Sequence, residues 1–227
     1  MTDQTATLDW RDTDHGAVPV STQFDDPYYS LSGGLEETRH VFLAGNDLPA
    51  RFRGDFHIAE LGFGTGLNLL TTWAAWDAAG ATGQLTFTSF EAFPMATADM
   101  ARALAAFPEV APLTETLLSK WSPDAGPTQL TDSLTLNVIT GDARRSLPAW
   151  DGRADAWFLD GFSPAKNPAL WEPELLAQVH AHSAPGGSAA TYSAAGHVRQ
   201  ALTDAGFVVA RIPGFGRKRH MTTARRG

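Results

Sequence analysis

The sequence predicts an α/β fold built on a mostly parallel sheet with helices on both faces. Three observations support this prediction. After residue 55, short apolar segments alternate with helical segments, the pattern of repeated strand–helix units. One apolar segment runs directly into three alternate glycines, Gly62, Gly64 and Gly66, and then into a helix. A second apolar segment ends in an acidic residue, Glu91.

Residues 1–55 are expected to form an N-terminal extension that packs on the core, because they are rich in Asp, Gly, Pro and aromatic residues. Only residues 35–44 have helical character. A turn-rich loop at residues 24–30 carries three aromatic rings and two carboxylates. It could cover a ligand or pack on the core, and packing is the more common fate of such rings.

Residues 56–227 are expected to form the main domain. The expected strands are residues 56–61, 85–90, 134–139, 154–159, 188–192, 207–212 and 219–224. The expected helices are residues 67–79, 95–107, 168–183 and 194–205, and residues 107–127 are expected to be irregular, with Trp121 packing on the core. Such alternation is typical of a Rossmann-like sheet.

Composition excludes several classes of protein. A chain of 227 residues with 43% hydrophobic and 19% charged residues is long and apolar enough for one globular domain. The absence of cysteine excludes disulfides, cysteine nucleophiles and thiolate metal sites, and fits a cytoplasmic protein. No signal peptide and no membrane-spanning run of about 20 apolar residues is expected, and the histidines show no metal-binding spacing.

The charge is unevenly distributed along the chain. The formal net charge is −8, which by itself argues against a nucleic-acid partner. Residues 211–227, however, contain six basic residues and no acidic one. This asymmetry predicts a basic patch on an acidic body, with a merely solvated C-terminal end as the alternative.

The glycine turn predicts a nucleoside cofactor at the carboxyl end of the first strand. The segment Glu60-Leu-Gly-Phe63-Gly-Thr-Gly66 lets the backbone turn sharply and approach a ligand closely. A dinucleotide-binding turn favours a small residue where Leu67 stands, and the charge of Glu60 disfavours a pyrophosphate. S-adenosylmethionine carries positive charge and no phosphate, and is therefore favoured, whereas a purely structural turn is the alternative.

Two further acidic residues lie at predicted strand ends, which share one edge of a parallel sheet. Glu91 is placed to accept the two hydroxyls of a ribose. Asp142 suits a hydrogen bond from an adenine amino group. It also suits the N-cap of a short helix at residues 143–147, and the two roles are compatible.

The segment Asp160-Gly-Phe162-Ser-Pro164 predicts the catalytic end of the site. Methyl transfer from a sulfonium to an amine requires a nitrogen with a free lone pair, while a free primary amine is mostly protonated near neutral pH. Asp160 could hold and orient that nitrogen and take its proton, beside the cofactor. Apolar surroundings from Phe162 and Pro164 would lower the pKa of the amine. The alternative is that Asp160 only forms the turn before Gly161.

Two basic segments could contact a nucleic acid. Lys166 could contact phosphate, although an exposed lysine is more often simply solvated. The loop that contains Phe215, Arg217, Lys218 and Arg219 could stack on a base and hold phosphates. A hairpin loop without such a role is the alternative.

Several motifs together resemble the tRNA (5-methylaminomethyl-2-thiouridine) methyltransferases. The resemblance extends over nearly the whole chain. It is carried by Phe24-Asp-Asp-Pro-Tyr-Tyr-Ser30, by Gly34 to Leu43, by Glu60 to Asn68, by Trp157 to Pro168, and by Gly214-Phe-Gly-Arg-Lys-Arg219. The motif from Asp160 to Pro168 is the most specific of these.

The resemblance implies a class I S-adenosylmethionine-dependent methyltransferase fold and N-methylation of the 5-aminomethyl group of the tRNA wobble uridine. The turn with Phe63 and Asn68, together with Glu91 and Asp142, would hold the cofactor, and Asp160 would lie at the amine. Phe162, Lys166 and the loop of Arg217 to Arg219 would face the anticodon stem-loop. The stand-alone form is expected, without FAD. Alternatives are methylation of a small-molecule or protein amine and a non-catalytic nucleoside-binding subunit.

Overall fold

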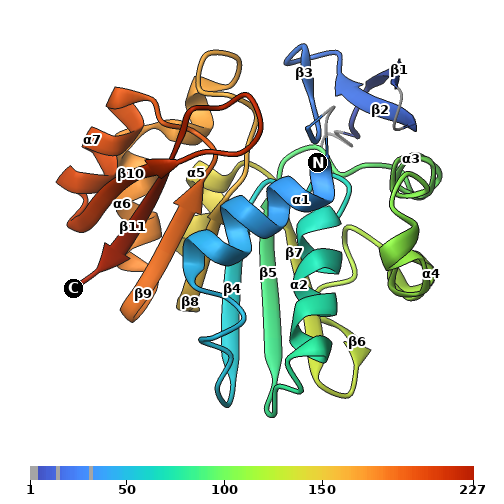
Figure 1. The fold of residues 1–227 in the computed structure, drawn as a ribbon, viewed down its shortest axis with the longest axis horizontal. Coiled ribbons are helices and arrows are strands. Elements are labelled where there is room, and N and C mark those ends of the chain that lie inside the picture. Colours follow the sequence, from blue (N-terminus) through green and yellow to red (C-terminus); the bar gives the residue numbers. More distant parts are fainter. Residues whose placement is uncertain (1–4, 14–15, 31–32) are drawn as a thin grey trace.

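We describe the protein from a computed structural model of residues 5–13, 16–30 and 33–227. A central eight-stranded sheet organises its fold (Figure 1). Its strands lie in the order β10-β11-β9-β8-β4-β5-β7-β6. They are β4 (Phe56–Leu61), β5 (Leu85–Glu91), β6 (Thr128–Thr131), β7 (Leu134–Thr140), β8 (Ala154–Leu159), β9 (Ser183–Thr191), β10 (Phe207–Pro213) and β11 (His220–Arg226). β4 pairs in parallel with both β5 and β8, β5 with β7 and β8 with β9, whereas β6 and β11 are antiparallel to their neighbours. The mostly parallel sheet is therefore confirmed.

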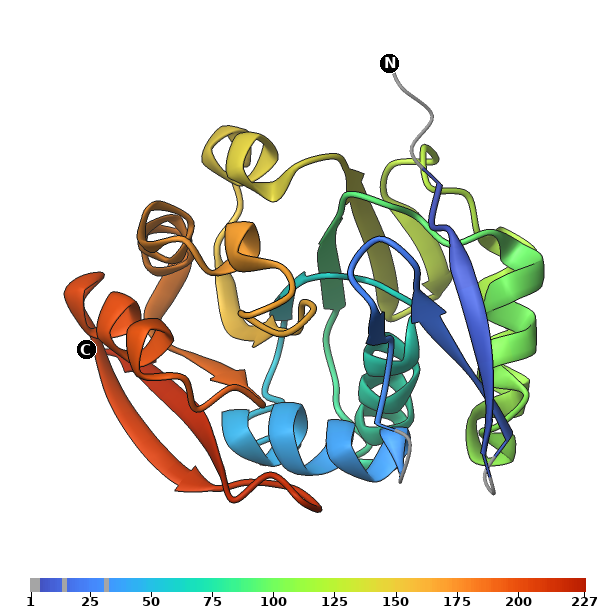
Figure 2. The ribbon, with the colours of Figure 1, turned by 90° about the horizontal axis from the view of Figure 1, so that it is seen from above.

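Helices cover both faces of this sheet, as predicted (Figure 2). One face carries α1 (Gly34–Thr38), its π-helical continuation η1 (Arg39–Leu43), η2 (Ala44–Asn46), α2 (Leu67–Ala78), α3 (Thr97–Leu104), η3 (Pro108–Val110) and α4 (Ala111–Lys120). The other face carries α5 (Ala143–Ser146), η4 (Leu147–Ala149), η5 (Pro168–Trp171), α6 (Pro173–Ala181) and α7 (Gly196–Asp204). Each layer buries its own apolar core against the sheet. Among the described residues, no helix has the length and apolar character needed to cross a bilayer.

Within residues 56–227, three elements depart most from the sequence-based prediction. The segment expected to be irregular contains α4. This helix has Pro112 in its first turn, where the missing N–H costs no hydrogen bond within the helix, and it buries Leu117. The short edge strand β6 was not predicted. The helix expected over residues 168–183 is broken, because Pro173 cannot continue a helix and holds Glu172 extended at φ −62° and ψ 141°.

The first part of the chain adds a small antiparallel sheet beyond the carboxyl ends of the parallel strands (Figure 1). It consists of β1 (Leu8–Thr13), β2 (Gly16–Ser21) and β3 (Asp26–Pro27). The hydroxyl of Tyr29 ties it to α3 by donating to the carbonyls of Ala17 and Ala103. The predicted extension over residues 1–55 includes residues 1–4, 14–15 and 31–32, which lie outside the described residues, and a boundary at residue 55 stays a prediction.

Candidate functional site

The glycine turn after β4 forms the floor of the site. Gly62, Gly64 and Gly66 all have positive φ angles, of 91°, 54° and 81°. A Cβ atom on Gly62 would lie 2.3 Å from the backbone oxygen of Asp160. Only glycine therefore allows the ends of the neighbouring strands β4 and β8 to lie this close together.

A cavity of about 1110 Å³ opens above this turn, at the carboxyl ends of the parallel strands. Its position matches the ligand-binding crevice of open α/β sheets. The predicted site residues that line it are Gly62, Phe63, Gly64, Asn68, Glu91, Asp142, Asp160, Phe162, Phe215, Arg217 and Lys218. Glu60, Gly66, Lys166 and Arg219 are not among the described residues that line it.

Glu91 is fixed at the end of β5 by two backbone hydrogen bonds. Its carboxylate oxygens accept from the N–H of Gly64 at 3.0 Å and from the N–H of Phe93 at 2.8 Å. Each carboxylate oxygen has a second lone pair, which leaves acceptor capacity for a diol. The two hydrogen bonds therefore hold the Glu91 carboxylate in one orientation, which is compatible with the predicted ribose contact.

Asp142 caps α5, as the alternative interpretation predicted. Its carboxylate accepts from the backbone N–H of Arg144 at 2.9 Å and also pairs with the guanidinium of the same residue. The hydrogen bond from Arg144 lowers the pKa of Asp142. Asp142 also lines the cavity, so the cap and the predicted adenine contact are compatible.

Asn68 joins two carboxylates below the cavity. Its amide nitrogen donates to Glu60 at 2.8 Å and to Asp160 at 2.6 Å, while its amide oxygen accepts from Thr38 at 2.8 Å. Glu60 also accepts from Ser89 at 2.7 Å. The amide is thus committed to holding the carboxylates in place, a role that the sequence-based prediction of cofactor contact did not include.

Asp160 is half-buried, with one part of its surface facing the cavity. Burial raises the pKa of Asp160 to about 7, the nearby Glu37 adds to the rise, and the hydrogen bond from Asn68 and the charge of Lys218 oppose it. A carboxyl group with a pKa near the working pH is suited to exchange a proton with a ligand.

Glu60 lies elsewhere than expected. It is fully buried beneath the floor of the cavity, and burial raises its pKa well above the ordinary value. Its oxygens face the amide of Asn68 and the hydroxyl of Ser89 rather than the cavity. The charge that Glu60 was expected to present to a cofactor is therefore replaced by a hydrogen-bonding role within the floor.

Three other predicted residues also lie outside the cavity lining. Gly66 precedes α2, and a Cβ atom there would press on Phe63 and Leu117 at 3.1 Å. Lys166 is exposed and its ammonium pairs with the carboxylate of Asp25, which competes with the predicted phosphate contact. Arg219 is exposed at the base of the β10–β11 hairpin.

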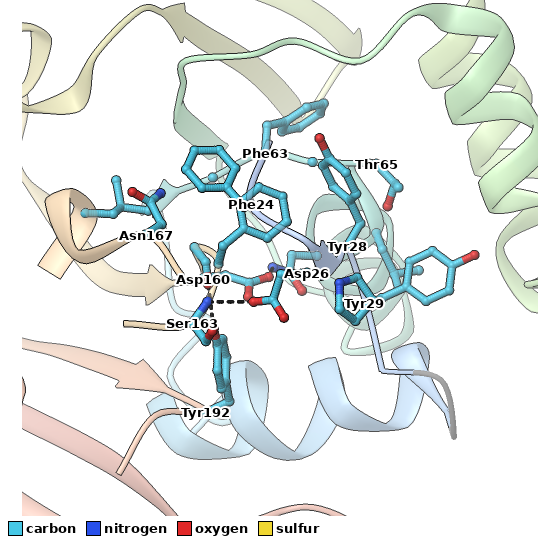
Figure 3. A pocket seen from close by; sticks show the side chains of 18 of the residues that line it. Phe24, Asp26, Tyr28, Tyr29, Phe63, Thr65, Asp160, Ser163, Asn167 and Tyr192 are labelled. Carbon is cyan, nitrogen blue, oxygen red and sulfur yellow. Dashed lines mark hydrogen bonds between the residues drawn. The ribbon is translucent and has the colours of Figure 1, made fainter. Parts of the chain in front are cut away.

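An aromatic cluster forms one wall of the cavity. The ring of Phe24 stacks on Phe162 at 4.8 Å and meets Phe93 edge-on at 5.8 Å, while Tyr28 meets Phe162 edge-on at 5.0 Å. In the view of Figure 3, Phe24, Tyr28 and Phe63 lie on one side of Asp160 and Tyr192 lies on the other. The loop at residues 24–30 therefore both packs and covers a cavity, which joins the two alternatives left open by the sequence.

Polar contacts fix this loop to the Asp160 turn. The carboxylate of Asp26 accepts from the backbone N–H of Ser163 at 2.8 Å (Figure 3). The pair of Asp25 and Lys166 adds a second connection. The covering loop and the turn that carries Asp160 are thus held in register although they are far apart in the sequence.

The cavity residues that sequence reasoning did not propose include Glu37 on α1 and Tyr192 after β9. The ammonium of Lys218 pairs with Glu37 at 2.7 Å and lies 4.0 Å from the ring centroid of Tyr192. The Tyr192 hydroxyl donates to the carbonyl of Gly161 at 2.6 Å. Glu37 stands in the segment from Gly34 to Leu43, which carries part of the family resemblance, whereas Tyr192 lies outside the segments named for it.

The residues present fit S-adenosylmethionine. The glycine cradle permits close backbone approach, Glu91 offers acceptors for a diol, and Asp142 offers an acceptor for an amino group. The carboxyl group of Asp160 lines the same cavity, as a positively charged cofactor favours. Among the described residues, no group of three or more His, Cys, Asp or Glu side chains could hold a metal ion.

Comparisons with known proteins show the family to which the chain is related. Residues 108–227 match the family model described as S-adenosyl-L-methionine-dependent methyltransferase. The "tRNA 5-methylaminomethyl-2-thiouridine biosynthesis bifunctional protein MnmC" of Pseudomonas aeruginosa is 46% identical over 96% of this chain and 34% of its own length, and that of Caulobacter vibrioides is 47% identical over 96% and 37%. The chain thus spans about a third of the length of these relatives.

A solved structure supports the same assignment. The crystal structure of MNMC2 from Aquifex aeolicus superimposes with a TM-score of 0.80 and 27% identity, over 96% of this chain and 70% of that one. The match with the family model covers more than half of the chain, and the glycine cradle, Glu91 and Asp160 lie around one cavity. We conclude that the chain belongs to the family of S-adenosyl-L-methionine-dependent methyltransferases.

Proposed function

We propose that this methyltransferase methylates the 5-aminomethyl group of (2-thio)uridine at the tRNA wobble position and gives 5-methylaminomethyl-(2-thio)uridine. One observation carries the proposal: Asp160 lies at the floor of a cavity walled by aromatic rings, with a pKa raised to about 7. A flat base can stack between such rings while its aminomethyl group reaches the carboxylate. The names of the two relatives support the same substrate.

The cavity residues divide the chemistry between them. When bound, S-adenosylmethionine supplies a methyl group on a sulfonium, and its transfer breaks the S–C bond, forms an N–C bond and leaves a neutral thioether. Asp160 accepts the proton that the substrate nitrogen loses, and Asn68 keeps the Asp160 carboxylate aimed at that nitrogen. The rings of Phe24 and Phe162 exclude water, which favours the uncharged amine. Positioning of the two reactants contributes much of the rate.

The basic loop between β10 and β11 provides the contact with RNA. Phe215, Arg217 and Lys218 line the cavity, and Arg217 and Arg219 are exposed. These side chains can hold phosphates around an anticodon loop, whose unstacked bases can be splayed into a pocket. We expect the protein to meet this substrate in the cytoplasm, and the absence of FAD from its reaction stays a prediction.

The test uses an anticodon stem-loop RNA that carries 5-aminomethyluridine at the wobble position. The protein is incubated with this RNA and a methyl-labelled donor, and the labelled nucleoside is identified by mass spectrometry. We expect one methyl group on the aminomethyl nitrogen. Label on a protein or on a small amine, with none on the RNA, would instead support the alternative substrates.

Asp160→Ala provides the matched test of the mechanism. The variant removes the proton acceptor but leaves the glycine cradle and Glu91 in place. We expect it to bind S-adenosylhomocysteine as the wild type does and to lose most of its turnover. Equal losses of binding and turnover would make Asp160 a cofactor-binding or folding residue.

A further inference from the structure

One end of the cavity contains an arrangement for a positively charged group that the roles above do not use. The carboxylate of Glu37 lies 2.7 Å from the ammonium of Lys218, and the same ammonium lies 4.0 Å from the centroid of the Tyr192 ring. A carboxylate beside an aromatic face is a general way to bind an alkylammonium ion. All three residues line the cavity.

The Tyr192 ring and the helix that carries Glu37 are held by the fold and not by Lys218, whereas the Glu37 carboxylate itself accepts from Lys218. The Glu37 side chain is only 13% exposed and projects from α1, whose neighbours Leu35 and Thr38 are buried. The Tyr192 hydroxyl donates to the carbonyl of Gly161 at 2.6 Å, which fixes the ring beside the Asp160 turn. The arrangement is thus a preformed pocket wall.

Lys218, in contrast, belongs to the β10–β11 hairpin loop, and 44% of its side chain is exposed. A lysine ends in a primary ammonium on a methylene group, and a protonated aminomethyl substituent on a base has the same ending. Lys218 therefore has the chemistry of a stand-in for such a substrate, on a long and flexible stem that allows it to leave the pocket.

The neighbouring charges are consistent with this arrangement. Glu37 contributes to the raised pKa of Asp160, and Lys218 opposes that rise, which places both groups within electrostatic reach of the proposed proton acceptor. An ammonium between Glu37 and Tyr192 would therefore lie within electrostatic reach of the carboxylate that takes its proton. The glycine cradle, Glu91 and Asp142 line other parts of the same cavity.

We propose that Glu37 and Tyr192 form a subsite for the primary ammonium of the substrate and that this ammonium displaces Lys218 when it binds. This inference rests on the proposed function and identifies the charge that selects the substrate. The displaced Lys218 becomes free to contact a phosphate of the RNA. Binding of the correct base thus exchanges an internal ion pair for a substrate ion pair and an RNA contact.

The test compares two anticodon stem-loop RNAs that carry 5-aminomethyluridine or uncharged 5-methyluridine at the wobble position. Their dissociation constants are measured by fluorescence anisotropy with saturating S-adenosylhomocysteine. We expect the wild type to prefer the aminomethyl RNA by a few-fold, because the ion pair and cation–π contact that the substrate ammonium gains are partly offset by those that Lys218 gives up. Glu37→Gln, which has nearly the same shape, should reduce this preference to about one.

Two further variants sharpen the comparison. Glu36→Gln is the matched control, because Glu36 is an exposed neighbour that pairs with Arg39 at 3.7 Å, and it should keep the wild-type preference. Lys218→Met removes the internal competitor and should increase the preference for the aminomethyl RNA, even if both RNAs bind more weakly. Thermal unfolding of each variant checks that the fold is intact.

Three results would overturn the inference. An unchanged preference in Glu37→Gln, while the wild type methylates the aminomethyl RNA, would remove the subsite and leave the proposed function standing. If Glu37→Gln loses as much affinity for S-adenosylhomocysteine as for the aminomethyl RNA, the subsite would be assigned to the ammonium of the methyl donor. If the wild type transfers no methyl group to the aminomethyl RNA, the proposed function fails and the ligand assigned to the subsite fails with it.

Discussion

Replacement of Gly62 by alanine tests whether the contact between β4 and β8 builds the site. The added Cβ atom would lie 2.3 Å from the backbone oxygen and 3.3 Å from the backbone carbon of Asp160. Neither atom belongs to a flexible side chain. Both strand ends are also held by hydrogen bonds, from Gly62 to the carbonyl of Phe90 at 2.9 Å and from Asp160 to the carbonyl of Leu61 at 3.2 Å.

The cost of this substitution has two parts. A side chain at a φ of 91° costs about 1–2 kcal/mol. Since real Cβ atoms hardly ever approach closer than 3.0 Å, the strand ends must also separate by roughly 3.0 − 2.3 = 0.7 Å, and overpacking of this kind costs about 1–3 kcal/mol. We expect the free energy of unfolding to fall by about 3 kcal/mol, which for a domain of this size lowers the Tm by about 6–12 °C.

Gly54→Ala is the matched control. Gly54 also has a positive φ, of 63°, but a Cβ atom there would meet no atom within 4 Å. This variant carries the conformational cost alone, about 1–2 kcal/mol. The difference between the two variants therefore isolates the steric contact with Asp160.

Thermal unfolding followed by circular dichroism measures the loss of stability, and titration calorimetry with S-adenosylhomocysteine measures the affinity of the cofactor site. We expect Gly62→Ala to lose more than tenfold in affinity because the floor of the cavity moves, whereas Gly54→Ala should bind as the wild type does. Equal melting temperatures for the two variants, together with normal affinity in Gly62→Ala, would refute the reasoning.

Three further predictions concern the carboxylates and the basic loop. Because the pKa of Asp160 is raised to about 7, the folded protein binds more protons than the unfolded chain between about pH 4 and 7, so its stability falls as the pH rises through this range. Urea unfolding of Asp160→Asn should lack this part of the pH dependence. An unchanged profile of stability against pH would contradict the raised pKa of Asp160. Asn68→Ala removes the donors shared by two carboxylates and should lower the free energy of unfolding by about 2–3 kcal/mol. The pKa seen in the pH–rate profile should move upward. A pKa that stays in place would show that the Asn68 amide does not lower the pKa of Asp160. In the double variant Arg217→Ala and Arg219→Ala, the slope of log K for RNA binding against log salt concentration should shrink by about two. The control Arg53→Ala, which lies before the amino end of β4, should keep the wild-type slope. Equal slopes in all of these proteins would exclude phosphate contacts by the loop.

The local pattern of the sequence was sufficient for the parallel strands of the main sheet and for the glycine turn at their carboxyl ends. The strands at residues 56–61 and 154–159 were predicted with the bounds that the structure shows, because a buried parallel strand is a short apolar run between turn residues. The glycine turn and Glu91 followed from the rule that strand ends of a parallel sheet share one edge. The pattern failed for α4, where no strong apolar stripe marks the helix.

The substrate side of the site depends on contacts between distant parts of the chain. Glu37 and Lys218 are 181 residues apart, and Asp26 and Ser163 are 137 residues apart. Glu60 illustrates the same limit, since its burial beneath Asn68 removes it from the cavity although its place in the motif suggested a ligand contact.

The sequence by itself determined the α/β sheet, the glycine turn and the acidic strand ends, because these depend on the conformation of neighbouring residues and on hydrophobic periodicity. Only the tertiary structure decided which carboxylates face the cavity, which aromatic rings cover it, and which charges meet at its far end. Those features depend on burial and on the packing of separate elements against one another. No local pattern encodes them, because each requires the position of a partner from a distant part of the chain.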